Sequence, residues 1–191
     1  WSSDVCSSDL AGGVDSTALI VGDFSNGNDG IVIKNGKSLL DLKGRKINLV
    51  EFSVSHYLLA RALGVAGLGE RDVTTVNTSD ADIVGAFTGS ADVDAVVTWN
   101  PQLSEVAEVK GAAKVFNSSQ IPGEIIDLMV VNSATLKDNP KFAKALVGAW
   151  YESIALMKAQ TPAGKAAREA MAKASGTDLA GFEAQLSTTR M

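Results

Sequence analysis

The chain has 191 residues, of which 46% are hydrophobic and 20% are charged, and its formal net charge at pH 7 is −5. This composition is that of an ordinary globular protein. The mild acidity and the lack of a lysine and arginine cluster argue against nucleic acid as the main partner, because binding to phosphates needs a basic surface. No apolar run approaches the roughly 18 residues that a membrane-spanning helix needs.

Residues 1–10, WSSDVCSSDL, resemble the translation of a sequencing adapter, and we predict that they are an artefact. They contain Cys6, the only cysteine, so the rest of the chain offers no disulfide, thiol nucleophile or thiolate metal site. The remaining sequence starts abruptly at Ala11. We therefore expect an N-terminal portion, including any signal peptide, to be missing.

The first half of the chain alternates between apolar runs and turn-forming residues. Residues 17–21 form an apolar run that predicts a buried strand, and residues 22–30, rich in Gly, Asn, Asp and Ser, predict a loop. A second strand is predicted at residues 31–34, a helical turn at 38–42 and a third strand at 47–50.

A helix is predicted from Ser53 onward, because apolar residues then recur at helical spacing. Ser53 and Ser55 are natural N-caps, and the only histidine, His56, lies in the first turn. A helix that follows a strand in this way points its unpaired N–H groups and positive dipole end at the carboxyl edge of the sheet. Open α/β sheets bind ligands at that edge, although capping alone also explains these side chains.

Strands and helices continue to alternate up to residue 131, which predicts parallel βαβ units. The predicted strands are residues 72–76, 95–98, 113–116 and 125–131, and the predicted helices are residues 79–87 and 103–109. From residue 139 onward only helices are predicted. The first has an apolar stripe of Phe142, Leu146, Trp150 and Ile154, and two more run from residue 162 to 174 and from about 178 to 186.

Five segments together resemble the substrate-binding proteins of bacterial ABC importers for nitrate, aliphatic sulfonates, taurine and thiamine precursors. These segments are DLKG, SHYLL, NTSDADIVGAF, VDAVVTWNP and IIDLMVVN. Three others further resemble the urea transporter branch encoded near urea carboxylase: GDFSNGNDGIV, SVSHYLLARAL and SSQIPGEIIDL. Because proteins of that neighbourhood also handle guanidine, the branch does not settle the ligand.

The resemblance implies an α/β fold of the type II periplasmic-binding-protein class, with two α/β lobes and a ligand cleft between them. Residues 11–34 and 125–191 would form the remainder of an N-terminally truncated first lobe with the C-terminal helices, and residues 35–124 the second lobe. The strands at 31–34 and 125–131 would cross between the lobes.

Nine residues are candidates for ligand binding. By resemblance, Ser53, Ser55 and His56 face the cleft, where their donors suit a carbonyl or anionic oxygen. Trp99 follows a predicted strand and offers a flat ring for a planar or cationic ligand, and Asn100 offers an amide or simply starts the Asn-Pro turn.

The other four candidates are the carboxylates near the predicted crossovers, Asp23, Asp29, Glu124 and Asp127. Aspartates in loops also serve turns, which is the alternative for Asp23 and Asp29. An acid within the apolar run IIDLMVV, as Asp127 is, should be paired or lie at a strand edge. Four acids beside one aromatic ring favour a small planar ligand with many N–H donors.

We therefore predict a non-enzymatic solute-binding protein for urea or guanidine, with an oxyanion such as nitrate or a sulfonate as the alternative. A thiamine-pyrimidine-synthase-like enzyme is disfavoured because the residues after the adapter segment lack cysteine, and a ligand-sensing domain of a regulator is a third possibility. The resemblance implies a periplasmic or lipid-anchored monomer, with an ABC permease and its ATPase as partners. No cofactor or metal site is predicted.

Overall fold

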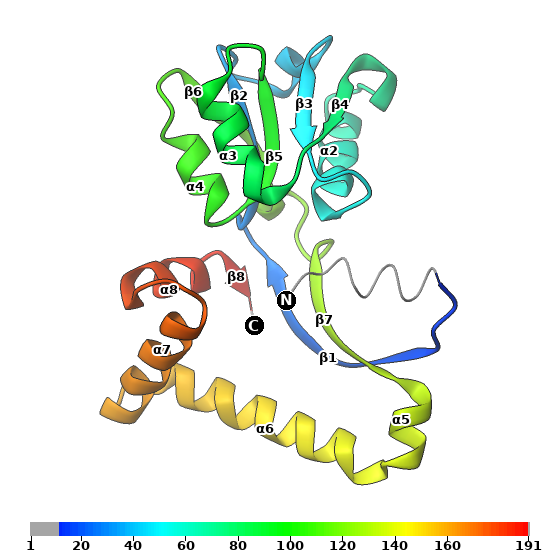
Figure 1. The fold of residues 1–191 in the computed structure, drawn as a ribbon, viewed down its shortest axis with the longest axis vertical. Coiled ribbons are helices and arrows are strands. Elements are labelled where there is room, and N and C mark those ends of the chain that lie inside the picture. Colours follow the sequence, from blue (N-terminus) through cyan, green and yellow to red (C-terminus); the bar gives the residue numbers. More distant parts are fainter. Residues whose placement is uncertain (1–11, 191) are drawn as a thin grey trace. The chain divides into compact units, whose positions relative to one another are not determined.

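The computed structural model describes residues 12–190 and contains two compact units (Figure 1). The first unit includes the described residues up to Asp23 and those from Ile126 onward, and the second unit is Phe24–Ile125. The predicted adapter segment, residues 1–10, lies outside the described residues.

The second unit is built on a five-stranded sheet with the strand order β4-β3-β5-β2-β6. Its strands are β2 (Asp29–Lys34), β3 (Lys46–Leu49), β4 (Thr74–Asn77), β5 (Ala95–Trp99) and β6 (Ala112–Asn117). Strand β3 is parallel to β4 and β5, whereas β2 is antiparallel to both β5 and β6. The carboxyl ends of β3, β4, β5 and β6 therefore lie at one edge of the sheet, together with the start of β2.

Helices cover both faces of this sheet, so its central strands are apolar on both sides. The helices are α2 (Val54–Val65), α3 (Asp80–Gly89) and α4 (Gln102–Ala107), with 3-10 turns η1 (Leu39–Leu42), η2 (Glu70–Asp72) and η3 (Ser118–Gln120). Helix α2 packs with Ile31, Ile33 and Val97 in one core. Helices α3 and α4 pack with Val32 and Val96 in the other. The alternation of neighbouring residues between two cores follows from the twofold period of a strand.

The strands and helices predicted for this unit are confirmed within a few residues, but the predicted loop at residues 22–30 is wrong. Strand β1 (Ser16–Ser25) runs into it from one side and β2 begins at Asp29 on the other. The extension depends on a distant partner, because the Ser25 N–H donates to the carbonyl of Ile125 at 3.0 Å. Strand β2, which the sequence assigned to the first lobe, lies inside the sheet of the second unit.

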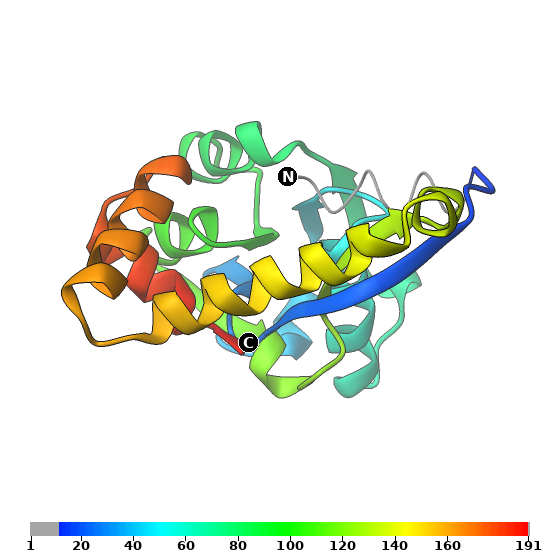
Figure 2. The ribbon, with the colours of Figure 1, turned by 90° about the horizontal axis from the view of Figure 1, so that it is seen from below.

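The first unit contains a three-stranded sheet with the order β7-β1-β8, followed by helices. Its further elements are β7 (Ile126–Asn132), α5 (Ser133–Asp138), α6 (Pro140–Lys158), α7 (Pro162–Ala174), α8 (Leu179–Leu186) and β8 (Thr189–Arg190). Figure 2 shows α6 running along β1. Gly22 of β1 lies next to the ring of Trp150 on α6, because a methyl group added at Gly22 would be 3.5 Å from Cζ2 of that ring. The three helices predicted after residue 139 are confirmed, but the prediction that only helices follow is wrong, because β8 comes after α8 and pairs with β1.

The apolar stripe of α6 is only half covered in the described structure. Leu146, Trp150 and Ile154 are half-buried and Phe142 is exposed, and no residue of the helix is fully buried. The 3.6-residue period therefore identified the helix correctly but overstated how deeply it is buried.

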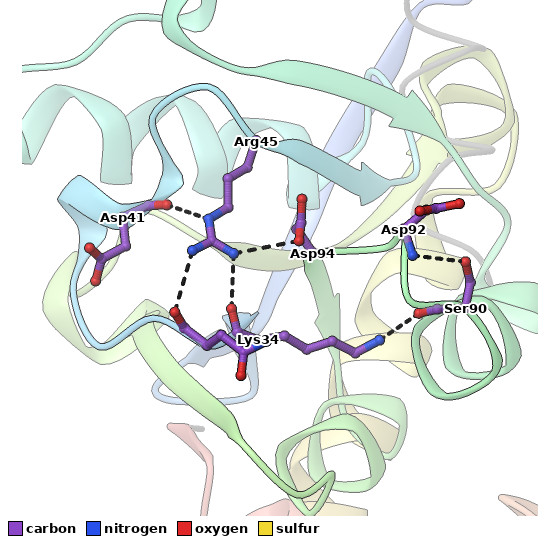
Figure 3. Close-up of polar contacts among 7 residues, drawn as sticks. Lys34, Asp41, Arg45, Ser90, Asp92 and Asp94 are labelled. Carbon is purple, nitrogen blue, oxygen red and sulfur yellow. Dashed lines mark hydrogen bonds and ion pairs between the residues drawn. The ribbon is translucent and has the colours of Figure 1, made fainter.

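Arg45 ties together several segments at the amino edge of the second unit's parallel strands (Figure 3). Its Nε donates to the carbonyl of Asp41 at 2.7 Å, and its Nη1 donates to the carbonyl of Lys34 at 2.9 Å. Its Nη2 reaches the carbonyl of Asn35 at 3.4 Å. The guanidinium therefore links the end of β2 to the turn that precedes β3 through hydrogen bonds.

Candidate functional site

The connections of the second unit produce a topological switch point at the carboxyl edge of its sheet. From β3 the chain passes through α2 to β4 at the edge, and from β4 it returns through α3, on the opposite face, to β5 on the other side of β3. The loops that follow β3 and β5 thus lead away to opposite faces. Open α/β sheets bind ligands in the crevice at such a switch point.

The loop after β3 brings Ser53 and Ser55 to this position. Ser53 is the N-cap of α2: its Oγ accepts the Ser55 N–H at 3.1 Å and donates to the carbonyl of Val50 at 2.7 Å. Ser55 is only 1% exposed, and its hydroxyl has no hydrogen-bond partner among the described residues. Ser53 therefore has a structural task, whereas the buried Ser55 hydroxyl has none that the described residues show.

His56 is held by the same loop. Its Nδ1 accepts the backbone N–H of Phe52 at 3.1 Å, so in the neutral imidazole the proton lies on Nε2. That Nε2 is 3.9 Å from Oε1 of Glu70, and the imidazole side chain is 19% exposed. His56 thus fixes the loop backbone, and a ligand role for it stays a prediction.

The loop after β5 contributes Trp99 and Asn100. Trp99 is half-buried at the end of β5, directly opposite Asp29 on β2. The Asn100 N–H donates to the carbonyl of Asn28 at 3.0 Å, and its Oδ1 accepts from the Ser104 hydroxyl at 2.6 Å. The predicted turn role of Asn100 is therefore present in the structure, and its side-chain oxygen is already used.

Asp29 lies among hydroxyl groups at the same edge and is 5% exposed. The Ser25 hydroxyl bonds to its carboxylate and also lies 2.6 Å from the hydroxyl of Ser118. The Ser118 Oγ in turn accepts the Gly27 N–H at 2.8 Å. This cluster holds the short connection between β1 and β2, which corresponds to the turn interpretation of Asp29.

Glu124 is bound by two side chains of α2. Arg61 donates to it from Nε at 2.5 Å and from its terminal nitrogen at 2.8 Å, and the Tyr57 hydroxyl donates at 2.7 Å. These donors, Arg61 first, lower the pKa of Glu124 to about 2. The carboxylate therefore fastens the segment before β7 to α2, and its charge is balanced.

The remaining two predicted acids belong to the first unit. Asp23 lies on β1 and Asp127 on β7, where its side chain is exposed at a strand end. The second unit thus collects Ser53, Ser55, Trp99 and Asn100 at one sheet edge with Asp29 beside them, and the ligand contacts of all nine candidates stay predictions.

The contact between Glu124 and Arg61 should make the stability of the fold depend on pH. Because the folded-state pKa of Glu124 lies below the usual 4.5, the contact stabilises the fold above about pH 4.5 and loses this effect as the pH falls towards 2. We expect Glu124→Gln to melt below the wild type at pH 6 and the two melting temperatures to converge by pH 2.

Thermal melts of both proteins between pH 6 and 2 measure this difference. Arg61→Gln removes the same contact from the other side and should show the same convergence. A difference in melting temperature that stays constant with pH would contradict this role of Glu124.

The described part of the chain has neither a metal-binding cluster nor a membrane-spanning helix. Within residues 12–190, no group of three or more His, Cys, Asp or Glu side chains is arranged to hold a metal ion. No helix in the same part of the chain is long and apolar enough to cross a membrane.

The sequence did not identify Phe52, Tyr57 or Arg61 as parts of this region. Tyr57 and Arg61 are four residues apart on one face of α2, but their partner Glu124 is distant in the chain. The sequence therefore indicated only that Tyr57 and Arg61 share one face of a helix, and it did not indicate that both bind an acidic side chain.

Comparison with known proteins identifies the family and the fold. The chain is 30% identical over 123 residues to a binding protein of Brucella abortus (strain 2308), covering 62% of this chain and 38% of that protein. It is also 30% identical over 124 residues to an aliphatic sulfonates-binding protein of Escherichia coli (strain K12), covering 65% and 38% respectively. The chain thus spans well under half the length of these relatives.

The crystal structure of the periplasmic aliphatic sulphonate binding protein SsuA from Escherichia coli superposes with a TM-score of 0.78. The match has 24% sequence identity and covers 95% of this chain and 62% of that one. The predicted α/β fold of the periplasmic-binding-protein class is therefore confirmed. The relatives named here are binding proteins, in agreement with the prediction that the chain is not an enzyme. Because residues 26–179 match the family described as NMT1/THI5 like, the chain belongs to that family.

Proposed function

We propose that this chain is part of the solute-binding component of an ABC importer, working in the periplasm as a monomer. It would capture a small ligand and deliver it to the membrane permease, whose transport is driven by an ATPase. The family, the fold and the similarity to sulfonate-binding proteins support this role. In such proteins, lobes that close on the ligand create the surface that the permease recognises.

The proposed ligand carries anionic oxygen atoms, as a sulfonate or nitrate does. One observation carries this choice: the N-terminus of α2, a helix of 12 residues, lies at the switch point of the second unit's sheet. The first N–H groups of a helix lack partners within it and attract anions, an effect of about 0.3–1 kcal/mol at exposed sites. Ser55 adds a buried hydroxyl without a partner among the described residues.

The structure also weakens the charge argument that favoured urea or guanidine. That argument counted four acids around the ligand, but Glu124 is paired with Arg61. Asp29 is bonded to a hydroxyl in the interior. Glu124 therefore adds no net negative charge to the second unit, and the Asp29 carboxylate is already used in the connection between β1 and β2. The sulfonates-binding relative points the same way, towards the oxyanion alternative.

Titration calorimetry on the protein at the length that its gene encodes tests this proposal. The probes are taurine, butanesulfonate, methanesulfonate, nitrate, urea and guanidinium. We expect at least one oxyanion to bind and neither urea nor guanidinium to do so. Binding of guanidinium or urea without any oxyanion would overturn the proposed ligand class.

The Ser55→Ala variant shows whether the bound oxyanion uses the proposed position. Because the Ser55 hydroxyl has no partner among the described residues, removing it should leave the melting temperature of the free protein unchanged or slightly higher. The dissociation constant should rise about three- to tenfold, the usual loss for one hydrogen bond. Unchanged affinity would place the oxyanion elsewhere.

A further inference from the structure

Phe52 combines two features that are unfavourable for an isolated protein. Its φ angle is +61°, in the left-handed region that bulky side chains rarely adopt. Its side chain is 90% exposed. Among the described residues, the one other non-glycine residue with positive φ is Asn35, and asparagine tolerates this conformation far better than phenylalanine does.

The left-handed conformation of Phe52 is fixed by its surroundings. Its N–H donates to Nδ1 of His56 at 3.1 Å, and the Glu51 N–H donates to Oδ1 of Asn77 at 3.0 Å. On the other side, the Ser53 hydroxyl holds the carbonyl of Val50. Strained residues that are held by several contacts cluster at ligand-binding positions.

The ring of Phe52 has little to pack on within its unit. Its centroid is 5.8 Å from that of His56, in a tilted arrangement, yet most of the ring surface stays in contact with solvent. A glycine at this position would remove both the backbone strain and the exposed apolar surface. The benefit of a phenylalanine must therefore come from a group outside these contacts.

Phe52 lies next to the proposed anion-binding position. Phe52 directly precedes Ser53, the N-cap of α2, at the switch point of the sheet. If the anionic group of a ligand binds at the N-terminus of α2, the carbon chain attached to that group would lie next to Phe52. We propose that Phe52 covers the carbon chain of the ligand, so that the site selects organic oxyanions over inorganic ones. This inference rests on the proposed function.

Phe52→Gly tests the proposal because it should raise the stability of the protein and lower its affinity for the ligand. Relief of the left-handed strain should raise the melting temperature of the full-length protein by about 2–4 °C. Loss of the ring should weaken butanesulfonate binding on the order of tenfold. Methanesulfonate binding should weaken less, and nitrate binding should not change.

Two further variants complete the comparison. Asn35→Gly alters the other left-handed residue, at the amino edge of the parallel strands, and should leave the affinity for butanesulfonate unchanged. Phe52→Leu keeps the strained backbone and an apolar side chain, so its affinity for butanesulfonate should lie between those of the wild type and Phe52→Gly. Calorimetry and thermal melts provide both measurements for every variant.

The possible results separate this inference from the proposed function. If the wild type binds none of the sulfonates or nitrate, both fail together. If it binds nitrate alone, the oxyanion function stands and the role of Phe52 fails. If it binds butanesulfonate and Phe52→Gly binds it equally well, the ring does not cover the ligand and this inference alone is overturned.

Discussion

Replacing Leu58 by alanine should lower the free energy of unfolding by about 2–5 kcal/mol, the range for a leucine removed from a closed core. Leu58 is 0% exposed and packs in the core between α2 and the sheet of the second unit. The loss combines the apolar surface that is no longer buried with the cavity that the missing atoms leave. Urea denaturation followed by circular dichroism measures it as a shift of the midpoint at constant slope.

Leu40→Ala is the matched control for this experiment. It deletes the same atoms from a side chain that is 63% exposed in the turn η1. Its effect should stay within about 0.5 kcal/mol, as for most surface substitutions. Similar losses for the two variants would show that α2 is not packed as described.

The Leu58 substitution also connects the core to the proposed site. Helix α2 carries Ser53 and Ser55 at its start and Leu58 one turn later. A looser helix would hold its first N–H groups less firmly against a bound anion. The apolar face of α2 thus positions the helix N-terminus at which we propose that the anion binds.

This helix was predictable from the sequence because all its signals are local. The serine cap and the apolar residues at helical spacing lie within 12 neighbouring residues. The same holds for the short strands, whose apolar runs are bounded by turn residues. Caps and periodicity give no information on contacts between distant segments, and the errors occurred there.

The connection between β1 and β2 illustrates such an error. Its Gly, Asn, Asp and Ser residues predicted a loop, yet Ser25 extends β1 by bonding to the carbonyl of Ile125. The hydroxyl of Ser118, 93 residues away, completes the cluster around Asp29. A local sequence pattern does not indicate a hydrogen-bond partner that is so distant in the sequence.

The positions of the candidate site residues in the fold were predictable to a similar degree. The sheet edge, the serine cap and Trp99 followed from element order alone, because strand ends and helix starts meet there. The charge of the site did not, since Arg61 neutralises Glu124 across 63 positions of sequence. The conformation of Phe52 was also hidden, because a positive φ is normally signalled by glycine or asparagine.

Arg45→Ala should lower the free energy of unfolding by about 2–3 kcal/mol, because it removes a shared donor from three backbone carbonyls. The carbonyls are those of Lys34, Asn35 and Asp41. The Arg45 side chain is 24% exposed, so water can bond to some of these carbonyls when the side chain is removed. The loss of stability is therefore smaller than the cost of leaving three buried carbonyls without a donor. Urea denaturation measures the effect.

Two companion variants separate these hydrogen bonds from the charge of Arg45. Its Nη1 is also 3.5 Å from Oδ1 of Asp94, whose side chain is 43% exposed, and such surface pairs contribute at most about 1 kcal/mol. Asp94→Asn should therefore cost little. Arg45→Lys keeps the charge but lacks the planar fork that reaches several carbonyls at once, so it should lose most of what Arg45→Ala loses. If Arg45→Lys were as stable as the wild type, the charge and not the fork would hold this edge of the sheet together.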